Sequence, residues 1–286
     1  MPDRVVDTHM RFWDLATGWY PGMADYARSV ATPELASDFG PDDYQQAVGS
    51  FPVDKLLHIS AALTPRSYLD ELRWAVKLAD EHHLDMRYIG CVDATMSPAE
   101  IVADLNAQQA MTSGFAGIRV VYDFEPDSPA VHTVLSWLTE HDVVFDLVTQ
   151  PDEMADWIRV LERFPDLTVS LVHTGFPTAD NDDAHAEWLE AVQLCARETR
   201  ASCKVSGLSM TTNTFEPTAL RRWIEPAIET FGWDRVMFGS NFPIHRIAGT
   251  YQELQAGFDA VIGDATADEQ DQFYARNAIE VYGFEP

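Results

Sequence analysis

The sequence has little of what marks several large classes of protein. Its three cysteines, Cys91, Cys195 and Cys203, are odd in number and form no Cys-x-x-Cys pair, which argues against a disulfide framework and a thiolate metal site. No apolar run reaches the roughly 18 residues that a transmembrane helix needs. No GxGxxG or GxxxxGK[S/T] motif follows the first predicted strand, which argues against nucleotide binding.

Basic residues are also scarce. Lysine and arginine together number 19 against 46 aspartates and glutamates, so the formal net charge is −27. Such an acidic chain repels polyanions, and nucleic acid is not expected as a partner. The first ten residues contain Asp3 and Asp7 where a signal peptide needs a basic start and an apolar run. We therefore expect a cytoplasmic protein with no membrane partner.

The residues that are abundant predict a large core. Hydrophobic residues make up 46% of the 286 positions, and eight short apolar or β-branched runs alternate with amphipathic helical stretches. The runs are 4–10, 55–61, 86–93, 115–122, 143–150, 167–174, 202–208 and 235–242. Helix start signals lie between them, such as the capping box from Ser97 to Glu100. The pattern predicts a single (β/α)8 TIM barrel over residues 1–286, not an open doubly wound sheet.

The active-site face of such a barrel can be predicted from the strand ends. The connection at about 12–54 is too long for a plain loop, and we expect it to cover this face. The working residues of these barrels follow the carboxyl ends of the strands. That position selects His9, Arg11, Asp93, Arg119, Tyr122, Thr149, Gln150, His173, Ser206 and Asn241. Alternation along the first strand also predicts that Asp7, His9 and Arg11 point to one side.

Five short motifs occur in order along the chain. They are VDTHMRFWD (6–14), LVHTGFP (171–177), KVSGL (204–208), FGSNFP (238–243) and NAIEVYG (277–283). Together they resemble the amidohydrolase-related (amidohydrolase 2) family of TIM-barrel hydrolases, in the branch that contains sugar lactonases and 2-pyrone-4,6-dicarboxylate lactonase. The resemblance implies a hydrolase fold over nearly the whole chain.

Two positions depart from the metal-binding pattern that the resemblance implies. The family pattern has His-x-His after the first strand, a His after the sixth, and an Asp in a Gly-Ser-Asp-Trp-Pro motif after the eighth. Here Arg11 replaces the second histidine and Asn241 replaces the aspartate. An arginine cation repels a divalent ion, and an amide oxygen has little affinity for zinc. Only His9 and His173 remain, so we predict no catalytic metal and no other cofactor.

The remaining groups suit a small anionic or carbonyl-containing substrate. Arg11 and Arg119 could hold negative charge, His9 and His173 could move protons near neutral pH, and Asn241 could position water or the carbonyl. The predicted catalytic residues are thus His9, His173 and Asn241. The predicted substrate-binding residues are Arg11, Arg119, Tyr122, Asp93, Gln150 and Ser206, with His245 as a further lining candidate. The predicted reaction is metal-independent hydrolysis of a lactone-type ester, or its reverse.

Other interpretations stay open at this point. His9 could be a core histidine bonded to Asp7, and Arg119 could form a structural ion pair with Asp93 or Asp146. The same pocket could serve a lyase, isomerase or cyclase, because the loss of the aspartate removes the expected proton acceptor for water. A degenerate barrel that only binds a metabolite or a partner is the third hypothesis.

Overall fold

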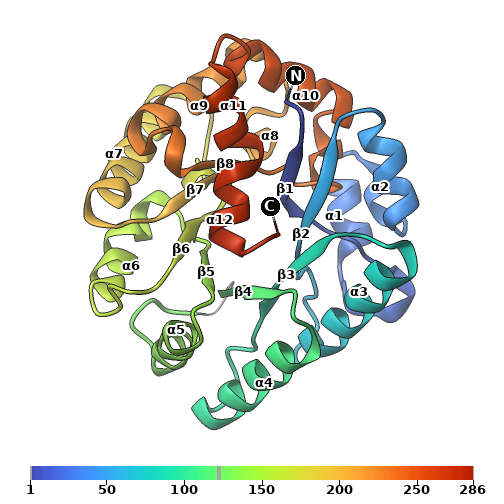
Figure 1. Cartoon of the computed structure of the whole chain (residues 1–286), viewed down its shortest axis with the longest axis vertical. Coiled ribbons are helices and arrows are strands. Elements are labelled where there is room, and N and C mark those ends of the chain that lie inside the picture. Colours follow the sequence, from blue (N-terminus) through green and yellow to red (C-terminus); the bar gives the residue numbers. More distant parts are fainter. Residues whose placement is uncertain (1, 121–123, 286) are drawn as a thin grey trace.

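The computed structural model describes residues 2–120 and 124–285, and its eight strands form one parallel sheet in the order β1 to β8 (Figure 1). The strands are β1 (Val5–Met10), β2 (Val53–Ile59), β3 (Met86–Cys91), β4 (Phe115–Val120), β5 (Val144–Leu147), β6 (Val169–Leu171), β7 (Ser202–Val205) and β8 (Val236–Phe238). The predicted (β/α)8 barrel is confirmed. Each predicted run overlaps one strand, although β2 begins two residues before its run, and most runs extend beyond the end of their strand.

Helices surround the sheet. They are α1 (Met23–Ser29), α2 (Pro41–Val48), α3 (Tyr68–His82), α4 (Pro98–Met111), α5 (Pro129–His141), α6 (Met154–Leu161), α7 (Asp182–Glu198), α8 (Ser209–Thr212), α9 (Pro217–Phe231), α10 (Tyr251–Ile262), α11 (Ala267–Asp271) and α12 (Asn277–Tyr282). The capping box predicted at Ser97 and Glu100 begins α4. In the described part of the chain, no helix is long and apolar enough to cross a bilayer.

The barrel closes between its first and last strands. Met10 and Phe242 form a parallel bridge, the amide of Asn241 donates to the carbonyl of His9 at 2.7 Å, and the amide of Arg11 donates to the carbonyl of Phe242 at 2.9 Å. These bonds join the carboxyl ends of β1 and β8. The closure therefore places His9, Arg11 and Asn241 side by side.

The side-chain alternation predicted for β1 is broken. Its pairing with β2 shifts register between Asp7 and Met10, which is the mark of a β-bulge. The Asp7 carboxylate accepts from the hydroxyl of Tyr44 on α2 at 2.6 Å and from that of Tyr251 on α10 at 3.4 Å. Asp7 thus lies on the helix side of the strand, and the prediction that it points the same way as His9 was wrong.

A buried ion pair lies inside the barrel. The Lys204 ammonium on β7 donates to the Asp146 carboxylate on β5 at 2.5 Å, and both side chains are fully buried. The Tyr282 hydroxyl of α12 donates to Asp146 at 2.9 Å and lies 2.8 Å from the Ser170 hydroxyl. Burial lowers the pKa of Lys204 to about 8, although the Asp146 charge acts in the opposite direction. Each charge depends on the other, because an isolated buried charge is costly.

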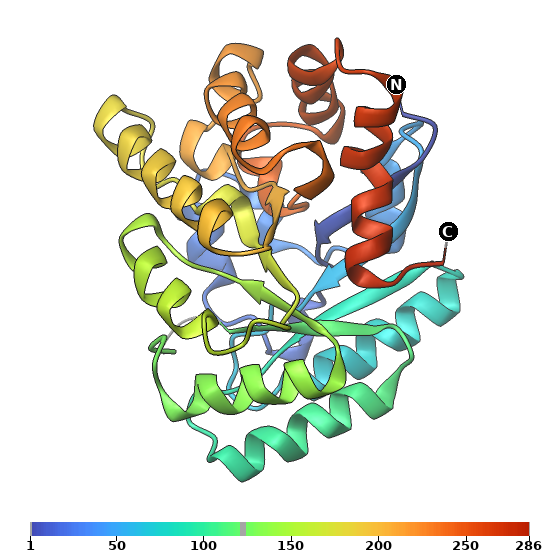
Figure 2. The same ribbon diagram turned by 60° about the vertical axis from the view of Figure 1, so that its left-hand side comes forward.

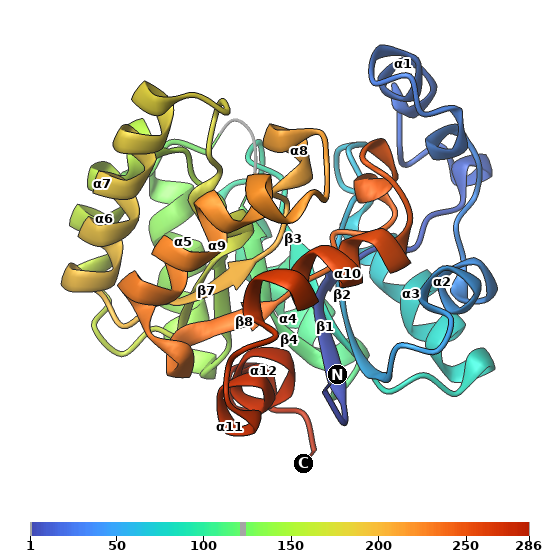
Figure 3. The same cartoon turned by 90° about the horizontal axis from the view of Figure 1, so that it is seen from above.

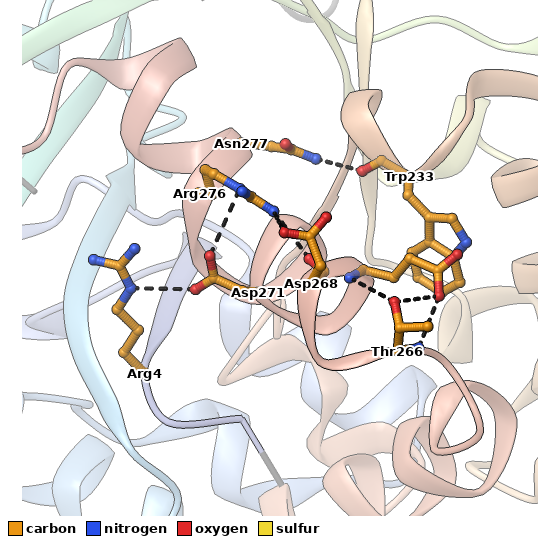
Figure 4. Close-up of polar contacts among 8 residues, drawn as sticks. Arg4, Trp233, Thr266, Asp268, Asp271, Arg276 and Asn277 are labelled. Carbon is orange, nitrogen blue, oxygen red and sulfur yellow. Dashed lines mark hydrogen bonds and ion pairs between the residues drawn. The ribbon is translucent and has the colours of Figure 1, made fainter.

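The C-terminal helices close the end of the barrel opposite α1 and α8 (Figure 3). Their polar contacts tie them to distant parts of the chain (Figure 4). Arg4, just before β1, pairs with Asp271 at 3.4 Å, and the Asn277 amide donates to the Trp233 carbonyl at 2.7 Å. Figure 2 shows the same helices standing beside the start of the chain.

The connection between β1 and β2 is structured. It contains α1, α2 and the short 3-10 turns η1 (Leu15–Thr17) and η2 (Pro33–Ala36). Trp13 and Phe39 pair as an antiparallel bridge, and both side chains are buried. Figure 3 shows α1 on the side toward which β1 points, where the active-site face is expected.

Candidate active site

An arginine lies between a histidine and an asparagine at the closure of the barrel. The Arg11 Nη1 donates to Asn241 Oδ1 at 2.6 Å, and its Nη2 lies 2.8 Å from His9 Nε2. Guanidinium has no acceptor, so His9 Nε2 must accept and its hydrogen must be on Nδ1. That Nδ1 is buried and has no hydrogen-bond partner among residues 2–120 and 124–285. The Nδ1–H is therefore a donor available to a ligand.

A second imidazole faces the first. His173 follows β6, and its ring centroid lies 4.3 Å from that of His9. Its Nδ1 lies 2.9 Å from the Ser206 hydroxyl after β7, which holds the ring in one orientation. His173 and Asn241 both adopt left-handed backbone conformations, with φ of 51° and 54°. Such φ values are uncommon outside glycine and often occur at functional sites.

The two histidines pack against two glycines that the sequence-based prediction missed. A Cβ on Gly207, which has φ of +73°, would lie 2.5 Å from the His173 ring. A Cβ on Gly239 would lie 2.9 Å from the His9 Cβ. Both glycines are in the quoted motifs, at strand ends, and that position was the available signal. The histidines can pack against the backbone here because neither glycine has a side chain.

Both histidines are neutral at pH 7. Burial lowers the pKa of His9 well below 6.5, and the cations around it, His173 when protonated and Arg11, lower it further. Burial likewise lowers the pKa of His173, with Arg11 as the next cause. Desolvation disfavours the charged imidazole, and nearby guanidinium adds repulsion. Neutral imidazoles can accept a proton.

Arg119 lies at the end of β4 and is only partly buried. Its Nη2 donates to the carbonyl of Ser60, which follows β2, and its Nε is buried without a partner among the described residues. Neither predicted ion pair is present. Asp146 pairs with Lys204, while Asp93 Oδ1 accepts from the amide and hydroxyl of Thr95 at 2.8 and 2.7 Å.

Among the described residues, no side-chain hydrogen bond joins the predicted positions Thr149 and Gln150 to this cluster. Gln150 is exposed just before a 3-10 turn, and Thr149 beside it is buried. Tyr122 lies outside the described residues. The structure thus brings together His9, Arg11, His173, Ser206 and Asn241, whereas the roles of Asp93, Gln150 and Tyr122 stay predictions.

Comparison with known proteins gives the family. The sequence profile of the amidohydrolase family matches residues 6–284. The chain belongs to the amidohydrolase family. It is accordingly a hydrolase-like enzyme acting on small molecules, as the motifs predicted.

Curated and solved relatives agree with this assignment. An L-fucono-1,5-lactonase from Burkholderia ambifaria is 26% identical over 264 residues, which is 88% of this chain and 84% of the relative. An amidohydrolase from Burkholderia multivorans, solved once with HEPES and once with zinc, has TM-scores of 0.84 and 0.83 at 21% and 22% identity, over 98% of this chain and 99% of that one. A probable 2-pyrone-4,6-dicarboxylic acid hydrolase from Acinetobacter baumannii, solved with citric acid, has a TM-score of 0.73 at 16% identity, over 98% and 99% of the two chains. The structural likenesses show a shared fold.

This amidohydrolase offers a divalent cation a poor set of ligands. His9 Nε2 already accepts from the Arg11 guanidinium, and the Asn241 oxygen accepts from the same group. Within residues 2–120 and 124–285, no three His, Cys, Asp or Glu side chains are grouped so that they could hold a metal ion. A metal at this position would also lie against a permanent positive charge.

We predict that Gly207→Ala will lower stability and activity by more than the strain of its left-handed backbone conformation alone would cause. Gly18 is the matched control, because its φ of +74° is nearly that of Gly207 and a Cβ there would meet nothing within 4 Å. Gly18→Ala should cost about 1 to 2 kcal/mol of unfolding free energy from left-handed strain. Gly207→Ala should cost more in urea unfolding and lower activity at least about tenfold by displacing His173. Equal effects of the two substitutions would contradict the proposed packing of His173 on Gly207.

Proposed function

We propose that this amidohydrolase opens a lactone-type ester of a small cyclic or carboxylated metabolite, or catalyses the reverse closure, without a metal. The observation that carries the proposal is the position of the Arg11 guanidinium, hydrogen-bonded to both His9 Nε2 and Asn241 Oδ1. A cation and a neutral amide at these places favour chemistry by side-chain acid, base and anion stabilisation. The lactonase activity named for a relative supports the substrate class.

Negative charge in the reaction would fall to the arginines. Arg11 and Arg119 are permanent cations with planar arrays of donors that match a carboxylate or an oxyanion. Asp7 accepts from helix tyrosines, and Asp93 accepts from Thr95 through Oδ1, while Asp93 Oδ2 has no partner among the described residues. The charges of the described site residues thus favour a substrate that brings an anion.

His173 is the proposed base. Ser206 occupies its Nδ1, which leaves Nε2 for the attacking water. As the oxygen of water bonds to the lactone carbonyl carbon, Nε2 takes one proton from that water. The ring carbon–oxygen bond then breaks, and the leaving alkoxide takes the proton from His173, which returns to the neutral form. The His9 Nδ1–H can donate to the carbonyl oxygen while negative charge develops there.

A non-hydrolytic reaction is the second candidate, and the identity of Asn241 favours it. An amide cannot accept a proton from water in the way that a carboxylate does. A lyase, isomerase or cyclase could use the same histidines and arginines while excluding water. The two candidates differ in the fate of the oxygen of water.

The test is to assay the purified chain on L-fucono-1,5-lactone and 2-pyrone-4,6-dicarboxylate in the presence of a chelator and 18O-labelled water. Hydrolysis predicts that one labelled oxygen enters each product molecule. His173→Ala combined with His9→Ala should lower turnover by at least about a hundredfold, the usual range for loss of an acid–base group. Parent-like turnover by the double variant, or activity lost with the chelator, would refute the proposal. An unlabelled product would favour the second candidate.

The pKa shifts predict an unusual pH dependence. Because burial holds the pKa of His173 well below 6.5, kcat/KM should stay nearly constant as the pH falls from 8 through 6.5. An unshifted base would lose half its activity near pH 6.5. The linked effect on stability has a definite sign: the unfolded state binds the proton first, so this histidine's contribution to unfolding free energy falls as pH drops below about 6.5. A pH–rate profile with an acid limb centred near 6.5 would contradict a neutral, buried base.

A further inference from the structure

A buried carboxylate on α3 collects the donors of the turn that follows β2. Glu71 is 1% exposed. Its Oε1 accepts from the amides of Ala61 and Ala62, each at 2.9 Å, and its Oε2 accepts from the Ser60 hydroxyl. A carboxylate that accepts several donors from one turn fixes that turn's conformation.

The same turn holds Arg119. The carbonyl of Ser60 accepts from Arg119 Nη2, while the amide of Ser60 donates to the Ile89 carbonyl at 2.9 Å. Ser60 is thus joined to Glu71 through its hydroxyl and to Arg119 through its carbonyl. Glu71 and Arg119 themselves form no direct ion pair. The hydrogen-bonded route from Glu71 to the guanidinium therefore runs through Ser60.

The connection between β1 and β2 also contacts this turn. The Tyr20 hydroxyl donates to Glu71 Oε1 at 3.0 Å. The carbonyl of Trp19 accepts from the amides of Leu63 and Thr64 at 2.8 and 3.1 Å. The segment that follows β1 and the residues that follow β2 therefore share Glu71 as an anchor.

We propose that Glu71 is a positioning residue that sets the place of the Arg119 guanidinium, through Ser60, for binding the anionic group of the substrate. The proposal rests on the proposed anion-binding role of Arg119. A purely electrostatic role for Glu71 would have the opposite effect, which makes the proposal testable. If Glu71 acted only by its negative charge, removing that charge would make the site around Arg119 more positive and strengthen anion binding. A positioning role predicts the reverse, because a turn without its anchor lets the guanidinium move.

The test measures binding of citrate, used as a tricarboxylate probe, to the 286-residue chain by titration calorimetry. Glu71→Ala should raise the Kd about tenfold, the scale of one hydrogen-bonded charge contact. Glu71→Gln should restore the Kd to within about threefold of the parent, because an amide oxygen can still accept from Ala61 and Ala62. Asp70→Ala is the matched control on the same helical turn, since Asp70 is exposed and pairs only with Arg73 among the described residues; it should change nothing.

A double-mutant cycle shows whether Glu71 acts through Arg119. In an Arg119→Gln background, Glu71→Ala should have no further effect on the Kd, because the group that it positions is gone. Effects that multiply, or a Glu71→Ala variant that binds like Asp70→Ala or more tightly than the parent, would overturn the proposal. If Glu71→Ala does not fold, Ser60→Ala, which removes only the hydroxyl link, takes its place with an expected rise of about threefold.

The same data separate this proposal from the proposed function. If Arg119→Gln leaves citrate binding unchanged, Arg119 does not hold the anion, and the proposed role of Arg119 fails together with that of Glu71. If Arg119→Gln weakens binding while Glu71→Ala does not, only the positioning role fails. Tyr20→Phe, which removes one donor and leaves the others on Glu71, should bind within about twofold of the parent.

Discussion

The site depends on one interaction, the pair of hydrogen bonds that the Arg11 guanidinium donates to His9 and Asn241 at the closure of the barrel. The main-chain bonds between β1 and β8 put these three residues in neighbouring positions, so the contact follows from the fold itself. The guanidinium determines the tautomer of His9, and it adds to the effect of burial in lowering the pKa of both histidines. It also donates hydrogen bonds to the nitrogen and oxygen atoms that would otherwise be free to coordinate a metal. The chemistry proposed for the site follows from that one cation.

Several features around this contact, namely strained backbone conformations and buried charges, cost folding free energy, and each is compensated by its neighbours. His173 and Asn241, which have left-handed backbone conformations, lie just after the ends of β6 and β8. Gly207 has no side chain and so leaves room for the His173 imidazole. Below them, Lys204 and Asp146 neutralise each other inside the barrel. To one side, Glu71 accepts four hydrogen bonds and stabilises the turn that carries the Arg119 contact. Strain and buried charge of this kind are tolerated where the surrounding structure is rigid, and they concentrate at functional sites.

Much of this could be predicted from the sequence. The eight strands follow from the alternation of apolar runs with amphipathic helices, and the strand-end rule selected His9, Arg11, His173, Ser206 and Asn241, which the structure brings together. The orientation of Asp7 could not be predicted, because a bulge changes side-chain alternation without changing composition. The partners of Arg119 and the part played by Glu71 were also out of reach, since a bond to a backbone carbonyl depends on spatial register and leaves no residue signature. The pairing of Lys204 with Asp146 joins positions 58 residues apart and is likewise a property of the closed barrel.

The most direct test of the account is the metal content of the chain purified without chelator, compared with that of the Arg11→His, Asn241→Asp double variant after both are incubated with zinc and desalted. The parent should retain almost no zinc, whereas the double variant, with a third imidazole and a carboxylate in place of the cation and the amide, should retain about one ion per chain. Stoichiometric zinc in the parent would show that the guanidinium does not exclude the ion, and the account of this site would then be wrong.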